Sequence, residues 1–416
     1  MAARSSVSVR MYHVGFGDAF LVTVRRGRRT WRMLVDCGVH SQGTARPIRE
    51  VVSAIIADLA EVTPAGRPPH LDVVVATHRH ADHISGFGVD QWAEVSVDEV
   101  WLPYLEDPDD DEARATRSAQ MAAAREVQRL ALALGGPDRS TWPPGLALAD
   151  ALALNSLSNA QSMDRLLGRG SGFRTPATVR FLPRGDEPRT TLPTGLPDTV
   201  VHVLGPPRDP ELLRRMDPPS AVAWLRLAGA TAQLRGDGLP LFDPAYHVAD
   251  GSVPAALAAV APSLRLDELA DEIDEVVNAA AGIEHSVNNS SLFLVLDVAG
   301  TRLVFPGDAQ YGAWQHVLGD PESRALVAHP AFYKIGHHGS HNATPREYVE
   351  SDLGEGAYAM LPWGLVKRWA DSIPKAELID ALAEHHTRVI RTDEVLEDPR
   401  VEVNGTLWSE VTLTVG

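Results

Sequence analysis

Residues 71–88 read LDVVVATHRHADHISGFG, and this stretch decides how the rest of the chain is interpreted. The apolar run 73–76 predicts a strand that is buried on both faces, because such strands carry continuous rather than alternating apolar residues. Four potential metal ligands follow within six residues: His78, His80, Asp82 and His83. Imidazole and carboxylate groups are ligands that zinc and its divalent neighbours accept, and a rigid strand end can aim them at one point.

The spacing within this cluster predicts two ions. His78 and His80 are two residues apart, so in extended backbone their side chains point to the same side. Asp82 and His83 follow where the chain turns, and they can face a second ion about 3.5–4 Å from the first, as in two-metal hydrolases. A polar surface loop that carries histidines by chance is the alternative, and the preceding strand argues against it.

Length and charge limit the classes of protein. The chain has 416 residues, of which 44% are hydrophobic and 22% charged, and we predict one elaborated domain over residues 1–416. The formal net charge of −17 argues against a protein that binds nucleic acid along a broad surface, because such binding requires many Lys and Arg contacts to phosphate. A small phosphoester substrate remains compatible, because a dinuclear site supplies its own positive charge.

Cysteine usage and hydropathy indicate the compartment. The single cysteine, Cys37, excludes a disulfide framework and fits a reducing compartment, so His, Asp or Glu must supply the metal ligands. We find no apolar run of about 18 residues, which predicts that the chain does not enter a membrane. The short polar start, residues 1–8, leaves no room for a signal peptide. We therefore expect a soluble cytoplasmic protein, whose oligomeric state the sequence does not indicate.

Two long segments separate the predicted core strands. Residues 106–170 begin with an acidic run and continue into Ala- and Leu-rich helical sequence at 113–134 and 146–167, which predicts a helical insertion. Residues 207–283 carry Leu- and Ala-rich pieces with several prolines, and we predict a second, mainly helical insertion. It is expected to be a lid or substrate wall, with a packing or dimerisation element as an equal alternative.

The C-terminal part adds two motifs at strand ends. A strand that starts at Asn288 is expected to pair with residues 301–305 across an Ala299-Gly300 turn and to lead into Pro306-Gly307-Asp308-Ala309. A further strand over 331–335 leads into Gly336-His337-His338-Gly339-Ser340. A carboxylate at a strand tip suits a bridging ligand, because one Asp oxygen can neutralise both ions. An N-cap for the next helix is the alternative for Asp308. Strands at 401–403 and 407–415 are expected to form a hairpin through a two-residue Asn404-Gly405 turn.

Together these motifs resemble the metallo-β-lactamase superfamily, whose hallmark is the pattern His-x-His-x-Asp-His. The stretches VGFGDAFL at 14–21 and KIGHHGS at 334–340 are similar to the hydrolase domain of bacterial competence DNA-uptake channel proteins and their soluble relatives. The resemblance implies an α/β fold, an αββα sandwich of two mixed β-sheets, with a metal-bound hydroxide as the nucleophile. It covers most core segments and neither insertion. The loop 363–371 differs from the polar loop of those relatives, so substrate preference is expected to differ.

The resemblance also implies a role for each candidate residue. His78 and His80 are expected to bind the first ion, and Asp308 is expected to bridge the two. The second ion is assigned to Asp82, His83 and His337. Asp82 is also expected to transfer a proton, and His338 to act beside the metal as substrate contact or proton carrier. Asp36 and Asp18 are expected to orient the ligands through hydrogen bonds.

One ligand of the family pattern is missing. Many members supply a further histidine to the first ion just after a strand that here corresponds to residues 200–204, and that strand runs into Gly205-Pro206-Pro207. His202, His285 and Asn288 are the candidates for this third ligand. A carboxamide or water ligand would make the first ion weakly bound. We expect two divalent metal ions, zinc in the first instance and manganese as the alternative.

Three functions are compatible with these residues. The leading hypothesis is a metal-dependent hydrolase that cleaves phosphodiesters, with nuclease activity implied by the competence-type resemblance. The alternative is hydrolysis of a small ester, lactone, thioester or nucleotide, which the acidic composition favours over a long polyanion. The third is a non-catalytic metal-binding interaction module, although a binding role requires no complete dinuclear ligand set.

Overall fold

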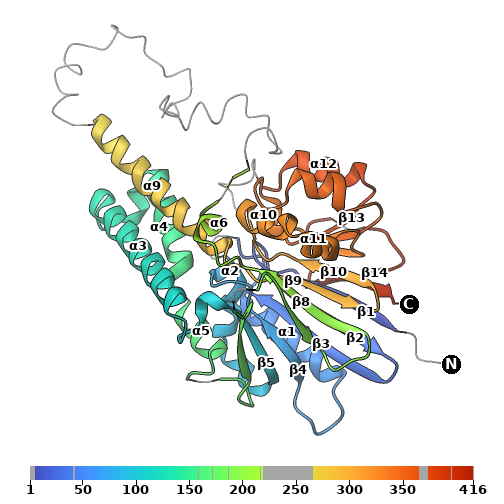
Figure 1. The fold of residues 1–416 in the computed structure, drawn as a ribbon. Helices are drawn as coiled ribbons and strands as arrows, with labels where there is room; N and C mark the ends of the chain where they lie inside the picture. The colour runs from blue at the N-terminus through green and yellow to red at the C-terminus, as the bar shows by residue number, and fades with distance from the viewer. Residues whose placement is uncertain are drawn as a thin grey trace.

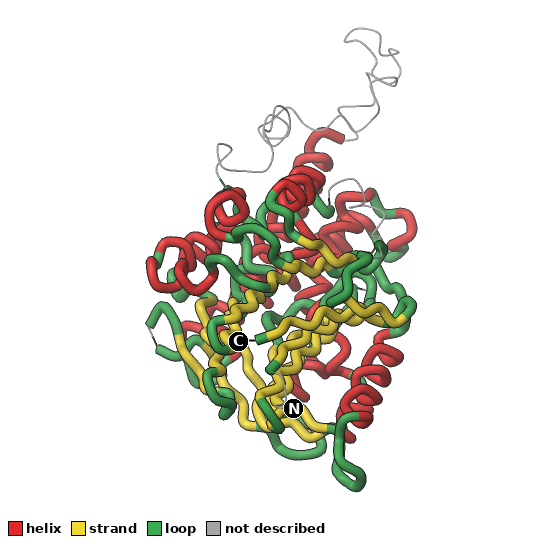
Figure 2. Tube along the Cα trace, turned by 90° about the vertical axis from the view of Figure 1, so that its right-hand side faces the viewer, coloured by secondary structure: helices red, strands yellow, loops and turns green. Residues whose placement is uncertain are grey.

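The computed structural model describes residues 5–40, 43–157, 159–170, 172–185, 187–215, 217–218, 266–364, 373–394 and 396–415. Within these residues the strands form two sheets that lie face to face, and helices cover the outer surface of each sheet (Figures 1 and 2). Each sheet contains both antiparallel and parallel pairs. The predicted α/β sandwich of two mixed β-sheets is therefore confirmed.

The first sheet has eight strands in the order β14-β15-β1-β2-β3-β4-β5-β6. Its N-terminal strands are antiparallel, and β3 to β6 are parallel, as the connecting helix between β3 and β4 requires. The strands in that order are Val401–Asn404, Trp408–Thr414, Ser6–Tyr12, Ala19–Arg26, Arg29–Cys37, His70–Val75, Ser96–Pro103 and Thr178–Leu182.

The second sheet has seven strands in the order β13-β12-β11-β10-β9-β8-β7. It repeats the arrangement of the first sheet, with antiparallel pairs from β7 to β10 and parallel pairs from β10 to β13. The strands in that order are Arg388–Arg391, Tyr358–Leu361, Phe332–Lys334, Thr301–Phe305, Phe293–Val298, Thr199–Gly205 and Thr190–Pro193.

The main apolar core lies between the two sheets. Phe20 from the first sheet and Phe305 from the second meet there edge to face, with ring centroids 6.2 Å apart. Helix α1 (Ile48–Glu61) covers the outer face of the first sheet. The outer face of the second is covered by α10 (Tyr311–Gly319), α11 (Pro321–Val327) and α12 (Ala376–Glu384).

Three helices form a separate unit beside the sandwich (Figure 1). We call this the helical unit; it consists of α3 (Asp111–Gly135), α4 (Pro144–Leu157) and α9 (Leu266–Asn288). Its small core contains Ala124, Trp142, Leu146 and Val276, so helices from the two predicted insertions pack on each other. Helix α5 (Ala160–Leu166) packs instead on the outer side of the first sheet. Short helices α2 (Ala81–Ile84) and α6 (Pro210–Arg214) are the remaining α-helices of the described residues.

Two local predictions are corrected. The single helix predicted over 146–167 is divided into α4 and α5, because the side chain of Asn159 donates to Arg79 O at 2.7 Å and holds the chain against the ligand loop. The hairpin between β14 and β15 pairs Asn404 with Trp408, so its connection has three residues instead of the expected two.

Some predictions fall on parts of the chain that the structure does not describe. Residues 219–265 of the second insertion and 365–372 of the loop before α12 lie outside the described residues. Among the described helices, none is long and apolar enough to cross a lipid bilayer.

Candidate metal centre

The first group of candidate ligands leaves the end of β4, as the sequence predicts. His78 and His80 point to the same side, with His78 Nε2 3.0 Å from His80 Nδ1, and both side chains are buried. Burial lowers the pKa of His78 well below its ordinary value and that of His80 to about 4. Both imidazoles are therefore neutral at pH 7, which is the form that binds metal.

Two glycines allow the ligand loop to lie close to the first sheet. A Cβ atom on Gly38 would come within 2.5 Å of both Ala81 O and His83 N. A Cβ atom on Gly17 would come within 2.8 Å of Asp82 O. Any larger residue at either position would displace the backbone that carries Asp82 and His83, so Gly17 and Gly38 set the position of the loop.

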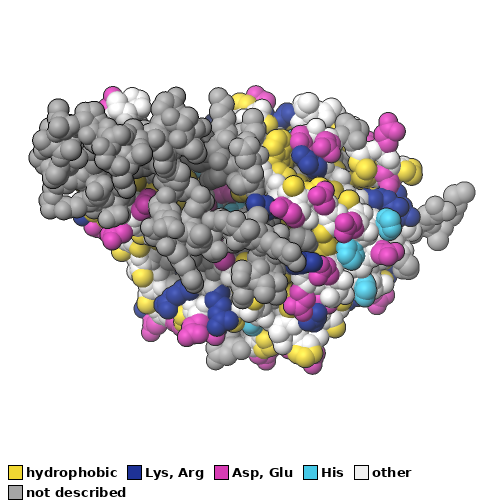
Figure 3. Space-filling model, turned by 90° about the horizontal axis from the view of Figure 1, so that it is seen from above, with side chains coloured by type: hydrophobic (Ala, Val, Ile, Leu, Met, Phe, Trp, Pro, Cys, Tyr) yellow, Lys and Arg dark blue, Asp and Glu magenta, His cyan; other side chains and the backbone are white. Residues whose placement is uncertain are grey.

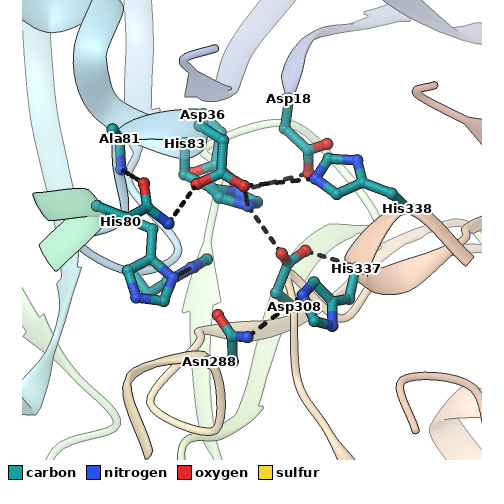
Figure 4. A network of polar contacts seen from close by, with 12 residues as sticks. Asp18, Asp36, His80, Ala81, His83, Asn288, Asp308, His337 and His338 are labelled. Carbon is teal, nitrogen blue, oxygen red and sulfur yellow. Dashed lines mark hydrogen bonds and ion pairs between the residues drawn. The ribbon is translucent and has the colours of Figure 1, made fainter. Parts of the chain in front are cut away.

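A second group of side chains gathers around His83, as Figure 4 shows. Its four members are Asp82, His83, Asp308 and His338, and their ligand atoms all lie within 4.8 Å of one another. Asp308 comes from the end of β10 and His338 from the turn after β11. His83 Nε2 lies 3.0 Å from Asp308 Oδ2, and Asp82 Oδ2 lies 3.4 Å from His338 Nε2.

Asp36 and Lys334 hold this second group in place. Asp36 Oδ2 lies 2.8 Å from His83 Nδ1 and accepts from Thr77 Oγ1, while Asp36 Oδ1 accepts from the Thr77 backbone N–H. The buried Lys334 ammonium lies 2.6 Å from Asp18 Oδ2 and 3.0 Å from Asp308 Oδ1. Lys334 is the first residue of the stretch 334–340, and no role was predicted for it from the sequence. A Lys that ends a buried strand was the available indication.

The charges of this group compensate each other. Burial alone would lower the pKa of His83, but the surrounding carboxylates, Asp308 foremost, raise it well above its ordinary value. Burial alone would raise the pKa of Asp308, but His83 and Lys334 hold it well below its usual range. The direction of both pKa shifts favours a protonated His83 beside an ionised Asp308.

The two adjacent histidines after β11 face different parts of the site. His337 and His338 both have left-handed backbone, with φ of 43° and 52°. His338 Nδ1 donates to Pro362 O at 3.2 Å, which leaves Nε2 free to face Asp82. His337 Nε2 instead lies 3.4 Å from Asn288 Nδ2. His338, not His337, thus joins Asp82, His83 and Asp308, which reverses the order favoured from the sequence.

Of the three candidates for a third ligand of the first ion, Asn288 is the one that reaches the site. It is the last residue of α9 and not the start of a strand. His285 Nδ1 lies 2.7 Å from Gln310 Oε1, and His285 is not among the residues that line the cavity at His80. His202 lies on the outer face of the second sheet, because its neighbours Val201 and Val203 point into the core, and it contacts Thr191.

Several buried atoms at the site have no hydrogen-bonding partner within the protein. They are His80 Nε2, Asn288 Oδ1 and Asp18 Oδ1. An unpaired buried polar atom costs about 1–3 kcal/mol, so two such atoms on His80 and Asn288, which line one cavity, indicate that a bound group pairs with them. A divalent cation accepts the lone pairs of imidazole, carboxamide and carboxylate alike, and the donor set therefore fits such ions.

A cavity of about 190 Å³ opens next to these groups. One side is formed by His80, Asp82 and His337, and the other by the helical unit through Leu148 and Leu152 of α4 and by Glu284 of α9. Burial raises the pKa of Glu284 to about 8. Glu284 belongs to no sequence motif and was not predicted; it reaches the site only because α9 packs against α4.

The two-sheet sandwich with a buried His/Asp cluster at one edge is consistent with the metallo-β-lactamase superfamily. The chain is 31% identical over 110 residues to ComE operon protein 3 of Bacillus subtilis (strain 168). The aligned part is 26% of this chain and 13% of that protein. No protein-family profile matches the chain. The partial similarity and the cluster fit a metal-dependent hydrolase.

Proposed function

We propose that this protein is a metal-dependent phosphodiesterase that works with two divalent ions, zinc or manganese. One observation carries the proposal: side chains from the ends of β4, β10 and β11 meet in one buried cluster, beside which His80 Nε2 and Asn288 Oδ1 have no hydrogen-bonding partner in the protein. The motifs shared with competence-type hydrolase domains favour a phosphodiester as the scissile group.

In this proposal the ligands divide between two positions. His78, His80 and Asn288 would hold one ion, and Asp82, His83 and His338 would hold the other. Asp308 would be shared through Oδ2, because its Oδ1 already accepts from Lys334 and from the His337 backbone N–H. Bound divalent ions lower the pKa of a water molecule to roughly 7 and polarise the phosphoryl oxygen.

The surrounding residues fix the geometry and move the proton. Asp36 receives the Nδ1 proton of His83, so that His83 Nε2 points to the ion. Asn155 of α4 donates to Asp82 Oδ1 at 3.3 Å, which turns Asp82 Oδ2 toward the centre of the site. Asp82 is therefore in position to take the proton of the attacking water and return it to the leaving group.

The test combines metal analysis with turnover. We expect the purified protein to bind two divalent ions per chain and to hydrolyse bis-p-nitrophenyl phosphate, with activity lost to a chelator and restored by zinc or manganese. The His80→Ala and Asp308→Asn variants should lose this activity. Turnover that is indifferent to chelator and to both substitutions would contradict the proposal.

Hydrolysis of a small carboxylic ester or lactone is the second candidate. It is favoured by the cavity beside the ligands, which has no Lys or Arg among its described lining residues and is walled on one side by leucines. The same preparation would then cleave a lactone panel faster than the phosphodiester. Two bound ions without turnover of either class would instead support the non-catalytic binding module.

A long nucleic acid is the phosphodiester least favoured by the charge distribution. The net charge is −17, and acidic and basic side chains are interspersed over the described part of the face seen in Figure 3. Nucleic-acid binding depends on a continuous basic surface that contacts many phosphates. Faster cleavage of linear single-stranded DNA than of small diesters would show that a long nucleic acid is the preferred substrate.

A further inference from the structure

A larger pocket lies next to the candidate metal centre. Its volume is about 630 Å³, within the range of about 300–1,000 Å³ that is usual for small-molecule sites. It lies between α4 and α5 on one side and the ligand loop with the end of β3 on the other. His40 and Asn155 line both this pocket and the 190 Å³ cavity at the ligands, so the two spaces are neighbours.

The pocket is fixed relative to the ligands by hydrogen bonds. Asn155 Oδ1 accepts from the Ala81 backbone N–H at 3.0 Å, and its Nδ2 donates to Asp82 Oδ1. Asn159 donates to Arg79 O at 2.7 Å. Helices α4 and α5 are therefore bonded to the same loop that carries the metal ligands, and a molecule in the pocket is held at a set distance from Asp82.

The lining of the pocket carries no uncompensated positive charge. Arg139 is the one cation among its described lining residues, and its Nε lies 3.1 Å from Asp150 Oδ2. Glu284 adds an acidic group to the adjoining cavity. A polyanion would meet only neutral and acidic groups here, which is unfavourable when many phosphates must be compensated.

The other lining residues suit an uncharged ring. Trp142, Ala151 and Leu154 supply apolar surface, and Asn155, Gln161 and Ser162 bring amides and a hydroxyl to the same walls. Ligand sites combine mostly apolar walls with a few polar groups that fix orientation, as this one does. A nucleoside or aryl group has both the apolar ring faces and the polar edges that such walls contact.

We propose that this pocket binds the uncharged, ring-bearing half of a small phosphodiester while the scissile phosphate lies at the metal centre. The inference rests on the proposed function, since it assumes that the metal centre attacks a phosphodiester. It adds the class of substrate: a diester of nucleoside or aryl size, with one phosphate and no long polyanionic extension.

The test compares two substrates that release the same product. Thymidine 5′-(p-nitrophenyl phosphate) presents a nucleoside to the pocket, and methyl p-nitrophenyl phosphate presents only a methyl group. We expect the native protein to have a kcat/KM at least tenfold higher for the thymidine ester. The Ala151→Trp variant fills the pocket from α4, and we expect it to lower the ratio of the two kcat/KM values at least tenfold, mainly through KM.

A matched control and a second readout keep the test independent of folding. Ala122→Trp places the same side chain on an exposed position of α3 and should leave the ratio unchanged. Calorimetry with thymidine alone should detect binding to the native protein and to Ala122→Trp, and at least tenfold weaker binding to Ala151→Trp. If the ratio of the two kcat/KM values and the binding of thymidine are both unchanged in Ala151→Trp, the pocket assignment is wrong. The proposed phosphodiesterase function would not be affected by that result. No turnover of either ester by the metal-loaded native protein would overturn the proposed function itself.

Discussion

The candidate metal centre has two parts that differ in charge. We call His78, His80, Asn288 and His337 the imidazole half, and Asp82, His83, Asp308 and His338 the carboxylate half. The first contains no carboxylate and has unpaired atoms on His80 and Asn288. The second places its charged groups in contact with one another and with Lys334. Because attraction to a divalent cation grows with ligand charge, the carboxylate half should fill first and hold its ion more tightly.

The largest effect is expected from removal of the shared carboxylate. Asp308→Asn keeps the shape of the side chain but removes the charge that faces His83 and Lys334. We expect kcat to fall by about 10²–10³ or more, as for other groups that stabilise developing charge, and the tightly bound ion to be lost. Steady-state kinetics measure the fall in kcat, and metal analysis measures the number of ions per chain. Retention of both ions with native turnover would contradict the bridging position of Asp308.

Removal of one imidazole separates the two halves. His80→Ala takes a ligand from the imidazole half and leaves the carboxylate half intact, so we expect the protein to retain one ion per chain and lose about 10² in turnover. Metal analysis after dialysis gives the stoichiometry. Simultaneous loss of both ions would show that the two halves do not bind their ions independently. The division of the site into an imidazole half and a carboxylate half would then be wrong.

A smaller effect is expected from the residue that orients His83. Asp36→Asn weakens the contact at His83 Nδ1 and the pair of bonds to Thr77 without changing a ligand. Replacement of such an outer partner usually costs about 10–100-fold in metal affinity. Competition with a metal indicator should therefore show weaker binding in the carboxylate half, with affinity in the imidazole half unchanged.

The pH dependence follows from the raised pKa of His83. A group whose pKa is higher in the folded than in the unfolded state stabilises the protein below its unfolded pKa, about 6.5 for His, and this contribution is lost as pH rises through the folded value. The metal-free protein should thus lose stability as the pH becomes alkaline. Metal requires neutral imidazole, so binding at pH 7 should release a proton from His83. Calorimetry in buffers of different ionisation enthalpy measures the release, and a buffer-independent heat would contradict it.

The smallest effect is expected at His202. Its ring lies on the outer face of the second sheet and contacts Thr191, apart from both halves. His202→Ala should change the free energy of unfolding by no more than about 0.5 kcal/mol and leave metal content and kcat unchanged. A loss of one ion in this variant would show that His202 is a ligand of the ion in the imidazole half.

The sequence predicted those parts of the site that depend on local spacing. The strand β4 and the shared direction of His78 and His80 follow from a two-residue interval in extended backbone, and the structure has both. The hairpin of β9 and β10 follows from its Ala299-Gly300 turn in the same way. The remaining candidate ligands were predicted from motifs at strand ends, where the register of a buried strand fixes the position of the next residue.

The parts that could not be predicted depend on tertiary contacts. Two consecutive residues with positive φ decide which of His337 and His338 faces Asp82, and no neighbour in the sequence indicates such a pair. Glu284 and Asn155 reach the cavity because α9 packs on α4 across a separation of more than a hundred residues. The partner of Lys334 likewise lies at the opposite end of the chain, at Asp18.

The wall opposite the metal ligands comes from α4, α5 and α9, which lie outside the two sheets. Of the groups proposed to act at the ions, these helices supply Asn288, at the end of α9, and Asn155, which donates to Asp82. A relative that kept these two residues but exchanged the rest of the wall would keep the proposed metal centre and acquire a different substrate range, which makes the wall the natural target for redirecting the protein toward new compounds.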